Sequence, residues 1–508
     1  MNFSKKTLKI KGGNSVSNDD SSVVMNSPLS ENLDDNVAFI KKEFGNSTDL
    51  IIRDLNISDE SSLRAVLIYV EGLTDTVTIQ ESIIQALTSE DFIKKLDPKK
   101  DLFSLVKKTV ISTSNIRELM NSNDIFSSIL SGSTLILFNE YNRGIIADTA
   151  GGEQRSIAPP EDQLVLRGPR DSFTENLRTN TSLLRRKIKN KNLRIQTKTI
   201  GSVSQTNIAM IYIKGIASED VVKELETKLD SIQISGVLES GIIEQLIEDR
   251  PWSPFPTIYN TERPDIIAAG LMEGRVAIAV DGTPFVLLVP SVFIQFFQAP
   301  EDYYERTDYG LLRLLRILSF FIALMGPSLY IALTTFHQEM IPTELFISIA
   351  AGRQGVPFPT FIEAIIMEST FEILREAGLR MPKSVGQAVS IVGALVIGQA
   401  AVEAGIISPS MVIVVSITAI SSFVMPAYNM GISVRILRFP LMLISASFGL
   451  FGIFIGIGLI LIHLSSLQSF GTPYLSPLSP FNILDQRDSL VRLPRLGLFM
   501  RKKSIKNE

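Results

Sequence analysis

The chain has 508 residues, no cysteine, two histidines and a formal net charge of −4. Residues 311–484 hold only 15 charged side chains although the rest of the chain is rich in charge, which excludes a protein that is soluble over its whole length. The lack of cysteine excludes disulfides, thiolate catalysis and cysteine-based metal sites, and the net charge is the sum of an acidic first part and a basic last part, so it indicates no nucleic-acid partner.

The first segment, residues 1–46, is rich in Ser, Asn, Lys and Asp and lacks the apolar run of a signal peptide. We expect it to be disordered. Because no targeting segment precedes the polar region before residue 311, we also expect that region to stay on the cytoplasmic side of a membrane.

Two apolar strand patterns are repeated along the polar region. A run that begins at Ala65 and passes through Tyr69 to a glycine recurs from Ile208 through Tyr212, and each run is followed by apolar residues at helical spacing. A second pair of runs, 131–139 and 273–281, lies at almost the same offset and leads into a hairpin. The sequence therefore predicts two similar duplicated α/β modules, over residues 47–160 and 199–310.

A basic linker, residues 161–198, separates the predicted modules. Arg170 precedes an amphipathic pattern that includes Leu177 and Leu184 and ends in the basic run Arg185-Arg186-Lys187. This pattern predicts a helix with either a solvated basic face or a face that contacts anionic lipid or an acidic partner.

Four segments after residue 311 are long and uncharged enough to cross a bilayer, which takes about 20 apolar residues. They are residues 317–336, 384–402, 404–434 and 439–464. A fifth uncharged run, 282–300, is assigned to the second hairpin and a short interfacial helix because prolines break it. The predicted fold class is an α/β soluble region followed by an α-helical transmembrane bundle of four or five spans over residues 311–464, with a C-terminal tail over 465–508.

The sidedness of the spans is left open by the arginines. Arg313 and Arg316 place the start of the first span in the cytoplasm by the positive-inside rule. Arg435 and Arg438 favour the same side, and so does the basic tail, yet only one predicted crossing separates them.

The segment from residue 340 to 380 is broken by Pro342, Pro357 and Pro359 and carries several carboxylates. Broken helices at membrane depth are tolerated only inside protein or along a water-filled path, so a pore lining fits this segment. Glu368, Glu372 and Glu376 share one helical face, and a surface helix at the membrane interface is the alternative. Stripes of small residues, one over 445–456, predict close helix packing.

Several strings of the sequence resemble the A subunits of the GerA family of bacterial spore germinant receptors. They include Asn260-Thr261-Glu262-Arg263-Pro264, His337-Gln338-Glu339-Met340-Ile341-Pro342 and residues 166–170, 247–256, 273–275, 281–285, 300–304 and 386–393. The resemblance covers about residues 50–500.

The resemblance implies a cytoplasmic α/β region and a multi-pass bundle in the spore inner membrane, with the N-terminal region on the spore core side. It also implies two partners, a transporter-like B subunit that holds the nutrient and a lipoprotein C subunit. It further implies a homo-oligomer, expected to be a pentamer, that acts as a nutrient-gated channel for monovalent cations. No cofactor and no metal are implied.

Within this frame, we expect a gate at the proline-broken segment. The hypothesis is that Gly355, Val356, Pro357, Phe358 and Pro359 of each copy form an apolar constriction that blocks ions by dewetting.

Four carboxylates are candidates for attracting cations to the mouth of that pore: Glu339, Glu344, Glu363 and Glu403. Glu403 is equally explained as an interfacial anchor. Competing functions are a non-conducting membrane scaffold and a nutrient transporter subunit. An enzyme is disfavoured, because the sequence shows no phosphate-binding loop, metal-ligand cluster or activated nucleophile.

Overall fold

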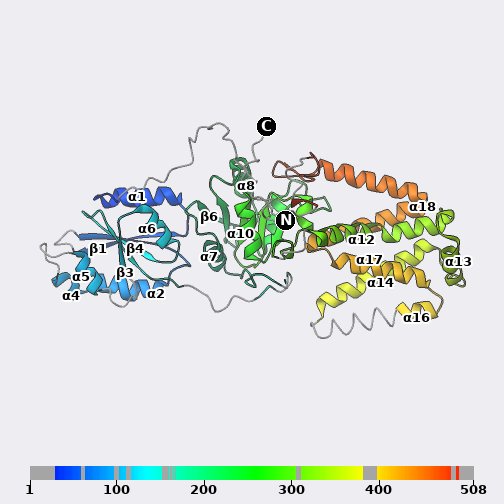
Figure 1. The fold of residues 1–508 in the computed structure, drawn as a ribbon, viewed down its shortest axis with the longest axis horizontal. Helices are drawn as coiled ribbons and strands as arrows, with labels where there is room; N and C mark the ends of the chain where they lie inside the picture. Colours follow the sequence, from blue (N-terminus) through cyan, green and yellow to red (C-terminus); the bar gives the residue numbers. More distant parts are fainter. Residues whose placement is uncertain are drawn as a thin grey trace, which may run out of the picture. The chain divides into compact units, whose positions relative to one another are not determined.

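A computed structural model describes residues 29–58, 63–95, 102–109, 116–151, 159–160, 163, 165, 167–304, 310–381, 398–481 and 488–490 (Figure 1). The chain divides into two compact units. The first comprises residues 1–152 with 189–191, and the second comprises the remainder. Each unit contains one five-stranded sheet, and the second also contains the helical part of the chain.

The first sheet has the strand order β1-β2-β4-β5-β3, and all its neighbours are antiparallel. Its strands are β1 (Leu50–Ser58), β2 (Leu63–Val70), β3 (Ile116–Leu119), β4 (Thr134–Phe138) and β5 (Gly144–Ala147). Side chains alternate between the faces of a strand, so Val66 and Ile68 of β2 pack on one face while Leu67 packs on the other.

Helices cover both faces of the first sheet. On the Val66 face lie α1 (Leu33–Phe44) and α6 (Ser122–Ile129). On the Leu67 face lie α2 (Thr76–Thr78), η1 (Ile79–Ile84), α3 (Gln85–Leu87), α4 (Glu90–Lys94) and α5 (Leu102–Thr109).

The prediction that residues 1–46 are disordered is wrong for the last part of this segment, which forms helix α1. Asn32 caps the helix by accepting a hydrogen bond from the Asp34 amide, and Gly45 ends it in the left-handed conformation, with φ of 63°. Leu33, Ile40 and Phe44 then bury one face of the helix on the sheet, a stripe that the polar composition around it obscures. Residues 1–28 lie outside the described part of the chain.

The second sheet repeats the strand order of the first, β6-β7-β9-β10-β8, as the sequence repeat predicts. Its strands are β6 (Leu193–Ile200), β7 (Thr206–Ile213), β8 (Tyr259–Thr261), β9 (Val276–Val280) and β10 (Val286–Val289). Strand β6 begins inside the range predicted for the linker. Helices α8 (Glu219–Ser231) and α9 (Ser240–Ile247) cover one face, and α7 (Leu177–Lys187) and α10 (Pro264–Met272) cover the other.

The linker helix α7 is part of the core of the second unit. Leu177, Leu183 and Leu184 pack under the second sheet, and Arg185, the first residue of the basic run, is fully buried. Lys187 pairs with Asp171 at 2.8 Å. The prediction of a solvated basic face is therefore wrong for Arg185.

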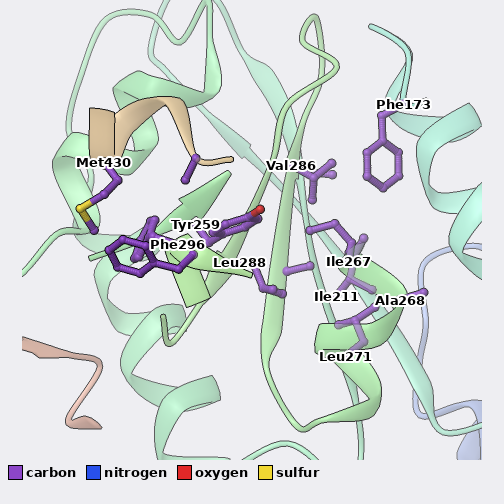
Figure 2. Packing of buried hydrophobic residues seen from close by; sticks show 14 of the residues in the cluster. Phe173, Ile211, Tyr259, Ile267, Ala268, Leu271, Val286, Leu288, Phe296 and Met430 are labelled. Carbon is purple, nitrogen blue, oxygen red and sulfur yellow. The ribbon is translucent and has the colours of Figure 1, made fainter. Parts of the chain in front are cut away.

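The apolar core on this face of the second sheet continues into the helical part (Figure 2). It joins Leu288 of β10 and Phe296 of η2 (Phe293–Phe297), which are both labelled in Figure 2, to Phe320 and Leu441 of two long helices and to Tyr474 near the tail. Ser469 of the hairpin β11 (Gln468–Ser469) and β12 (Thr472–Pro473) donates to the Thr257 carbonyl at 2.7 Å and accepts from the Ser291 amide at 3.0 Å. The chain after the helices thus returns to the second sheet.

The helical part is a bundle. Its helices are α12 (Leu311–Thr335), α13 (Thr343–Gly352), α14 (Thr360–Arg380), α16 (Gly398–Glu403), α17 (Pro409–Phe423) and α18 (Tyr428–Ser466), with short turns α11 (Glu301–Tyr304) and η3 (Gln338–Met340). Among the described residues, two helices are long and apolar enough to cross a bilayer, α12 and α18. The described part of the chain therefore does not confirm four or five such helices.

Three of the predicted spans differ from the structure, and one of them, 439–464, is broken by the non-helical backbone at Gly449. Residues 404–434 do not form one helix, because α17 ends at Phe423 and α18 begins at Tyr428, with Pro426 between them. The predicted span 384–402 lies largely outside the described residues, which resume at α16.

Helix α18 is a hairpin of two helical arms. Gly449 has φ of 60° and ψ of −140°, a backbone conformation that breaks the helix and that glycine adopts without steric cost. A methyl group on Gly452 would lie 2.6 Å from the Ile444 carbonyl oxygen, and one on Gly456 would lie 2.5 Å from Leu441, so the arms pack closely side by side. These two glycines belong to the stripe of small residues in the sequence.

The hairpin gives the bundle two ends, which we call the base and the tip. The base is where α18 meets the second sheet's loops, through Ser433 of one arm and His463 of the other. The tip is where Gly449 lies against Phe336 and His337 at the end of α12. Arg435 and the described start of the tail, residues 467–481, therefore lie towards the base, because α18 crosses the bundle and returns. The basic residues of the tail lie outside the described residues.

Candidate functional site

The predicted gate residues, Gly355 to Pro359, form the loop between α13 and α14. Gly355 has φ of +97°, and no other atom lies within 4 Å of the position that a Cβ would take. Pro357, Phe358 and Pro359 are exposed and Val356 is half-buried. The loop leads into α14 at the tip of the bundle, where the Thr334 hydroxyl donates a hydrogen bond to the Thr360 hydroxyl at 3.4 Å. Its side chains are thus displayed rather than packed within one copy.

Helix α13, which precedes this loop, is apolar but has no buried residue. Leu345 is exposed, and Ile347 has 61% of its surface exposed. The exposure of α13 could not be predicted from the sequence, because an apolar segment of this length is more often part of a core. An exposed apolar surface of this kind is typical of a site that contacts lipid or another protein chain.

The four acidic candidates fall into two groups. Glu339, Glu344 and Glu403 are exposed, and Glu403 accepts a hydrogen bond from Gln399 at 2.8 Å. Glu363 is fully buried instead.

The carboxylate of Glu363 is neutralised inside the bundle. It pairs with Arg353 at 3.0 Å and accepts hydrogen bonds from the Ser408 amide and hydroxyl at 3.1 and 2.7 Å. Arg353 also donates to Thr360, the first residue of α14. Glu363 is therefore placed to hold both sides of the loop between α13 and α14, whereas the charges of the three exposed carboxylates face solvent.

A second buried ion pair lies in the middle of the bundle. Glu368 of α14 is 0% exposed and pairs with Arg438 of α18, which is 1% exposed. The Arg438 Nε also donates to the Ala323 carbonyl of α12 at 2.8 Å. One arginine thus ties three helices together.

A third set of charges lies closer to the base. Glu372 of α14 pairs with Arg435 of α18 at 3.4 Å and with Arg375 of its own helix at 3.3 Å. Arg435 Nε donates to the Gly431 carbonyl at 3.1 Å. Within the described residues, Glu368 Oε1, Glu372 Oε1 and Arg438 Nη2 are buried atoms without a hydrogen-bond partner.

The sequence pattern showed these charges but not their pairing. Glu368 and Glu372 lie four residues apart and Arg435 and Arg438 three apart, which are the two spacings that place residues on one helical face. Matching an acidic face to a basic face could have predicted that α14 packs on α18. Of the three glutamates that share a face of α14, Glu368 is buried in the bundle, Glu372 is half-buried and Glu376 is exposed, so only the first half of the helix departs from the alternative of a surface helix.

The polarity of α14 is inverted relative to a helix of a soluble protein. Its two buried glutamates face inward, while Ile373 is 68% exposed. Helix α12 behaves in the same way, since Arg313 and Arg316 are buried and Leu315 and Leu318 are exposed. Charged residues that face a bundle interior with apolar residues outside are typical of a helix surrounded by lipid.

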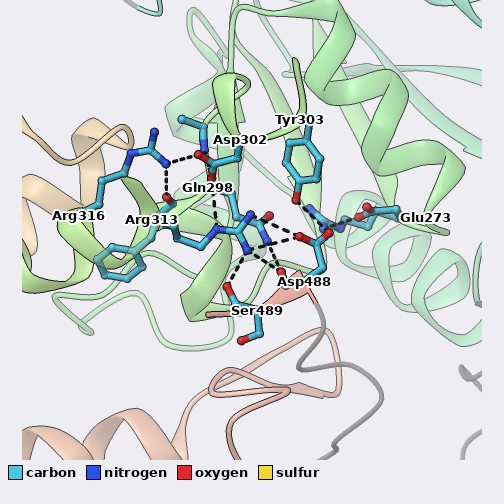
Figure 3. A network of polar contacts seen from close by, with 11 residues as sticks. Glu273, Gln298, Asp302, Tyr303, Arg313, Arg316, Asp488 and Ser489 are labelled. Carbon is cyan, nitrogen blue, oxygen red and sulfur yellow. Dashed lines mark hydrogen bonds and ion pairs between the residues drawn. The ribbon is translucent and has the colours of Figure 1, made fainter. Parts of the chain in front are cut away.

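The base of α12 is held by a network of charges (Figure 3). Asp302 is fully buried and accepts from Arg313 at 3.2 Å and from Arg316 at 2.6 Å. Arg313 Nη1 also donates to the main-chain carbonyls of Asp488 and Ser489, both at 2.6 Å. Arg313 and Arg316, from which the sequence predicted the side of the first span, are therefore buried and form ion pairs with one aspartate.

The network joins the tail to the junction between sheet and bundle. The Tyr303 hydroxyl donates to the Asp488 carboxylate at 3.3 Å. Burial raises the pKa of the Asp488 carboxyl, and the Arg313 guanidinium opposes this rise.

Comparison with known proteins identifies the family. The family described as Bacillus/Clostridium GerA spore germination protein matches residues 38–504. The chain belongs to this family. GerA is a family of germinant-receptor subunits and not an enzyme family.

Relatives of this GerA-family chain match it over nearly its whole length. It is 49% identical to spore germination protein KA of Bacillus subtilis (strain 168) over 481 residues, which cover 94% of this chain and 88% of the relative. It is 42% identical to the uncharacterized membrane protein YfkQ of the same organism over 468 residues, which cover 92% of this chain and 90% of the relative.

A solved structure is also similar to part of this GerA-family chain. It is the crystal structure of the N-terminal domain of the A subunit of the Bacillus megaterium spore germinant receptor GerK3, with 39% sequence identity and a TM-score of 0.43. The match covers 54% of this chain and 100% of the other.

In this GerA-family chain, several strings that carry the resemblance lie where the second sheet meets the bundle. Ser253 bonds to His463 at 2.9 Å, and Asp302 holds the base of α12. Arg263 is fully buried against Asp265 at 2.8 Å. No group of His, Asp or Glu that could hold a metal occurs among the described residues.

Proposed function

We propose that this chain is the A subunit of a nutrient-sensing germinant receptor in the spore inner membrane. Several copies, expected to form a pentamer, would surround a channel that releases monovalent cations when nutrient binds. The observation that carries the membrane placement is the inverted polarity of the bundle, in which Glu368 and Arg438 lie inside while Ile373 lies outside.

The dimensions of the bundle fit a bilayer. Helix α12 is ~37 Å long and the first arm of α18 ~31 Å at about 1.5 Å per residue, against a hydrocarbon thickness of about 30 Å. Because the base joins the second sheet, the sheet and the tail would share one side of the membrane. We assign that side to the spore core, where the N-terminal region also lies in this proposal.

The partners in this proposal come from the family. A transporter-like B subunit would bind the nutrient and a lipoprotein C subunit would complete the receptor. No nucleic acid, cofactor or metal has a role. The exposed α13 is consistent with contact to further subunits or to lipid, because it is apolar and none of its residues is buried among the described residues.

The channel part of the proposal rests on the tip of the bundle. In a ring of copies, the loop of Val356, Pro357 and Phe358 would meet around the axis and form an apolar constriction that excludes ions by dewetting. The exposed Glu339, Glu344 and Glu403 would enrich cations near it, while Glu363, paired with Arg353, would position the loop. Buried polar atoms without partners next to Arg438 favour hydration of the interior when the channel opens.

The gate is tested by Val356→Ala in spores. A smaller side chain widens an apolar constriction and favours its wetting, so we expect spores that leak monovalent cations and germinate without nutrient. Ile420→Ala, an exposed position on α17 away from the loop, is the matched control and is expected to behave as the unchanged chain. Dormant Val356→Ala spores with a normal nutrient response would place the gate elsewhere.

Conduction itself is tested by purifying the assembly, measuring its mass in detergent, and recording cation flux in liposomes. A ring of copies with flux is expected. A ring without flux would favour the non-conducting scaffold, and uptake of labelled nutrient by vesicles that contain this subunit alone would favour a transporter.

A further inference from the structure

The only tryptophan of the chain, Trp252, has 97% of its surface exposed. It lies in the loop between α9 and β8, among Pro251, Pro254 and Pro256, which restrict the backbone. The loop is anchored by Phe255, which is buried and packs against Phe293 with ring centroids 6.5 Å apart. A large aromatic side chain is thus displayed on a rigid loop, which requires an explanation because tryptophan is on average a highly buried residue.

The loop is fixed to both arms of α18 at the base of the bundle. Ser253 Oγ bonds to His463 Nε2 at 2.9 Å on the second arm, and Ser433 on the first arm donates to the Pro254 carbonyl. Arg250 donates to the hydroxyl of Ser466, the last residue of α18, at 3.0 Å. The loop therefore fixes Trp252 at the base of the bundle, at the level where both arms of α18 end.

That height is where the exposed apolar surface of the bundle stops. Leu459 and Ile462 are exposed on α18, four residues and one residue before His463, and Leu311 is exposed at the first residue of α12. Tyr428, the first residue of α18, is exposed at the same end. Trp and Tyr are enriched at membrane–water boundaries because their rings are apolar and carry one polar group.

Arg250 supplies the charge that a phospholipid requires at this boundary. It lines a hollow of about 430 Å³ together with Glu224, Asp249 and Ser466. Lys228 already pairs with Glu224 at 3.1 Å and with Asp249 at 2.5 Å. Among the described residues, Arg250 is in no ion pair, so its guanidinium is the cation in this hollow that can meet an anion.

We propose that Arg250 and Trp252 form a lipid-binding anchor, in which the indole lies at the glycerol level of the leaflet and the guanidinium binds a phospholipid phosphate. The anchor fixes the depth of the second sheet at the membrane surface. It rests on the proposed membrane placement but requires neither conduction nor any other subunit.

The test uses the intrinsic fluorescence of the full chain reconstituted in vesicles, because one tryptophan makes the signal specific to this loop. Vesicles contain phosphatidylcholine brominated either next to the carbonyls or near the bilayer centre, and aqueous iodide is added separately. We expect strong quenching by the shallow bromine, weak quenching by the deep bromine and poor access for iodide.

Two other outcomes would overturn the anchor. Efficient iodide quenching without quenching by either lipid would place the indole in water. Shielding from iodide without quenching by lipid would place it in a protein contact. Flotation of the vesicles separates these failures from failure of the membrane placement, because a chain that does not float with the vesicles is not inserted at all.

The role of Arg250 is tested with Arg250→Gln, which keeps the fluorescent residue. Exchanging part of the shallow-brominated phosphatidylcholine for phosphatidylglycerol brominated at the same shallow position should increase shallow quenching in the unchanged chain and do so less in Arg250→Gln. Arg380→Gln, an exposed arginine at the end of α14, is the matched control and should respond as the unchanged chain. Equal responses in all three chains would show that Arg250 does not bind the phosphate.

Discussion

The second sheet with its helices and the bundle belong to one compact unit but have opposite polarity. In the sheet region the interior is apolar, and pairs such as Lys198 with Asp230 lie at the surface. In the bundle Glu368 pairs with Arg438 inside, while Phe454 is 72% exposed. In both regions, side chains that the surrounding medium solvates poorly are buried. The opposite polarity of the sheet region and the bundle therefore indicates that water surrounds the first and lipid surrounds the second.

The junction between the two regions combines both kinds of interior. A continuous apolar core runs from Leu288 of the sheet to Phe320 and Leu441 of the bundle. Beside it, Asp302 binds two buried arginines of α12. The sheet region and α12 are therefore joined both by apolar packing and by buried ion pairs.

The largest effect is expected for the central ion pair. Arg438→Ala leaves the Glu368 carboxylate buried without a partner, which costs about 3–5 kcal/mol of stability. The measurement is the free energy of unfolding of the detergent-solubilised chain. The double variant Glu368→Ala/Arg438→Ala should recover part of the loss, because no unpaired charge remains.

The same helix offers a surface pair for comparison. Arg380 and Glu376 pair at 2.7 Å but both are exposed, so Arg380→Ala should change stability by only about 0.5 kcal/mol. Equal losses for Arg438→Ala and Arg380→Ala would mean that the interior pair is solvated, and the polarity difference between the two regions would be lost.

The hairpin of α18 is expected to be the next most sensitive feature. In Gly449→Ala the new methyl group would lie 2.7 Å from His337 and 3.0 Å from the Phe336 Cβ, in a conformation that strains any other residue by about 1–3 kcal/mol. Gly458→Ala meets no atom within 4 Å and should be neutral or slightly stabilising, because alanine favours a helix. Thermal unfolding of both variants checks this, and a harmless Gly449→Ala would argue against the hairpin.

A smaller effect, confined to the sheet region, is expected for pH. Burial raises the pKa of Glu244 from 4.5 to about 7, against the opposing hydrogen bond from Asn260. Between pH 4.5 and 7 the folded chain holds a proton that the unfolded chain has lost. Stability should therefore fall as pH rises through this window, by on the order of 2–3 kcal/mol, and level off above pH 7.

Glu244→Gln isolates this contribution, because the amide does not titrate. The melting temperature of the variant should depend less on pH over that window than that of the unchanged chain. Identical pH profiles for the two chains would show that Glu244 is solvated in the folded state.

The sequence predicted the sheets well and the bundle less well, for physical reasons. The repeated strands β2 and β7 are apolar runs followed by a glycine, Gly72 and Gly215, and these local signals recur at one offset. The reversal at Gly449 left no such signal, because uncharged residues surround it and hydropathy does not report a change of direction. Pro327 and Pro440, in contrast, lie inside helices that continue past them.

The candidate site was predicted in part. The proline-broken loop at residues 355–359 was found because prolines act locally, and its gating role stays a prediction. The pairing of Glu368 with Arg438 was missed because the two residues are far apart in sequence and are joined by tertiary packing alone. For the same reason, Arg313 and Arg316 were interpreted as membrane-flanking charges although they bind Asp302.

The chain's lack of cysteine allows the most direct test of the polarity difference, because a single introduced cysteine is the only thiol present. Phe454→Cys in the bundle and Val203→Cys in the sheet region replace two similarly exposed apolar residues, and their reaction with a water-soluble maleimide is followed in proteoliposomes permeable to it. We expect the cysteine at position 203 to react readily and the one at position 454 to stay unlabelled until detergent and denaturant are added. Equal labelling of both positions in intact proteoliposomes would show that water surrounds the bundle and would contradict its placement in the membrane.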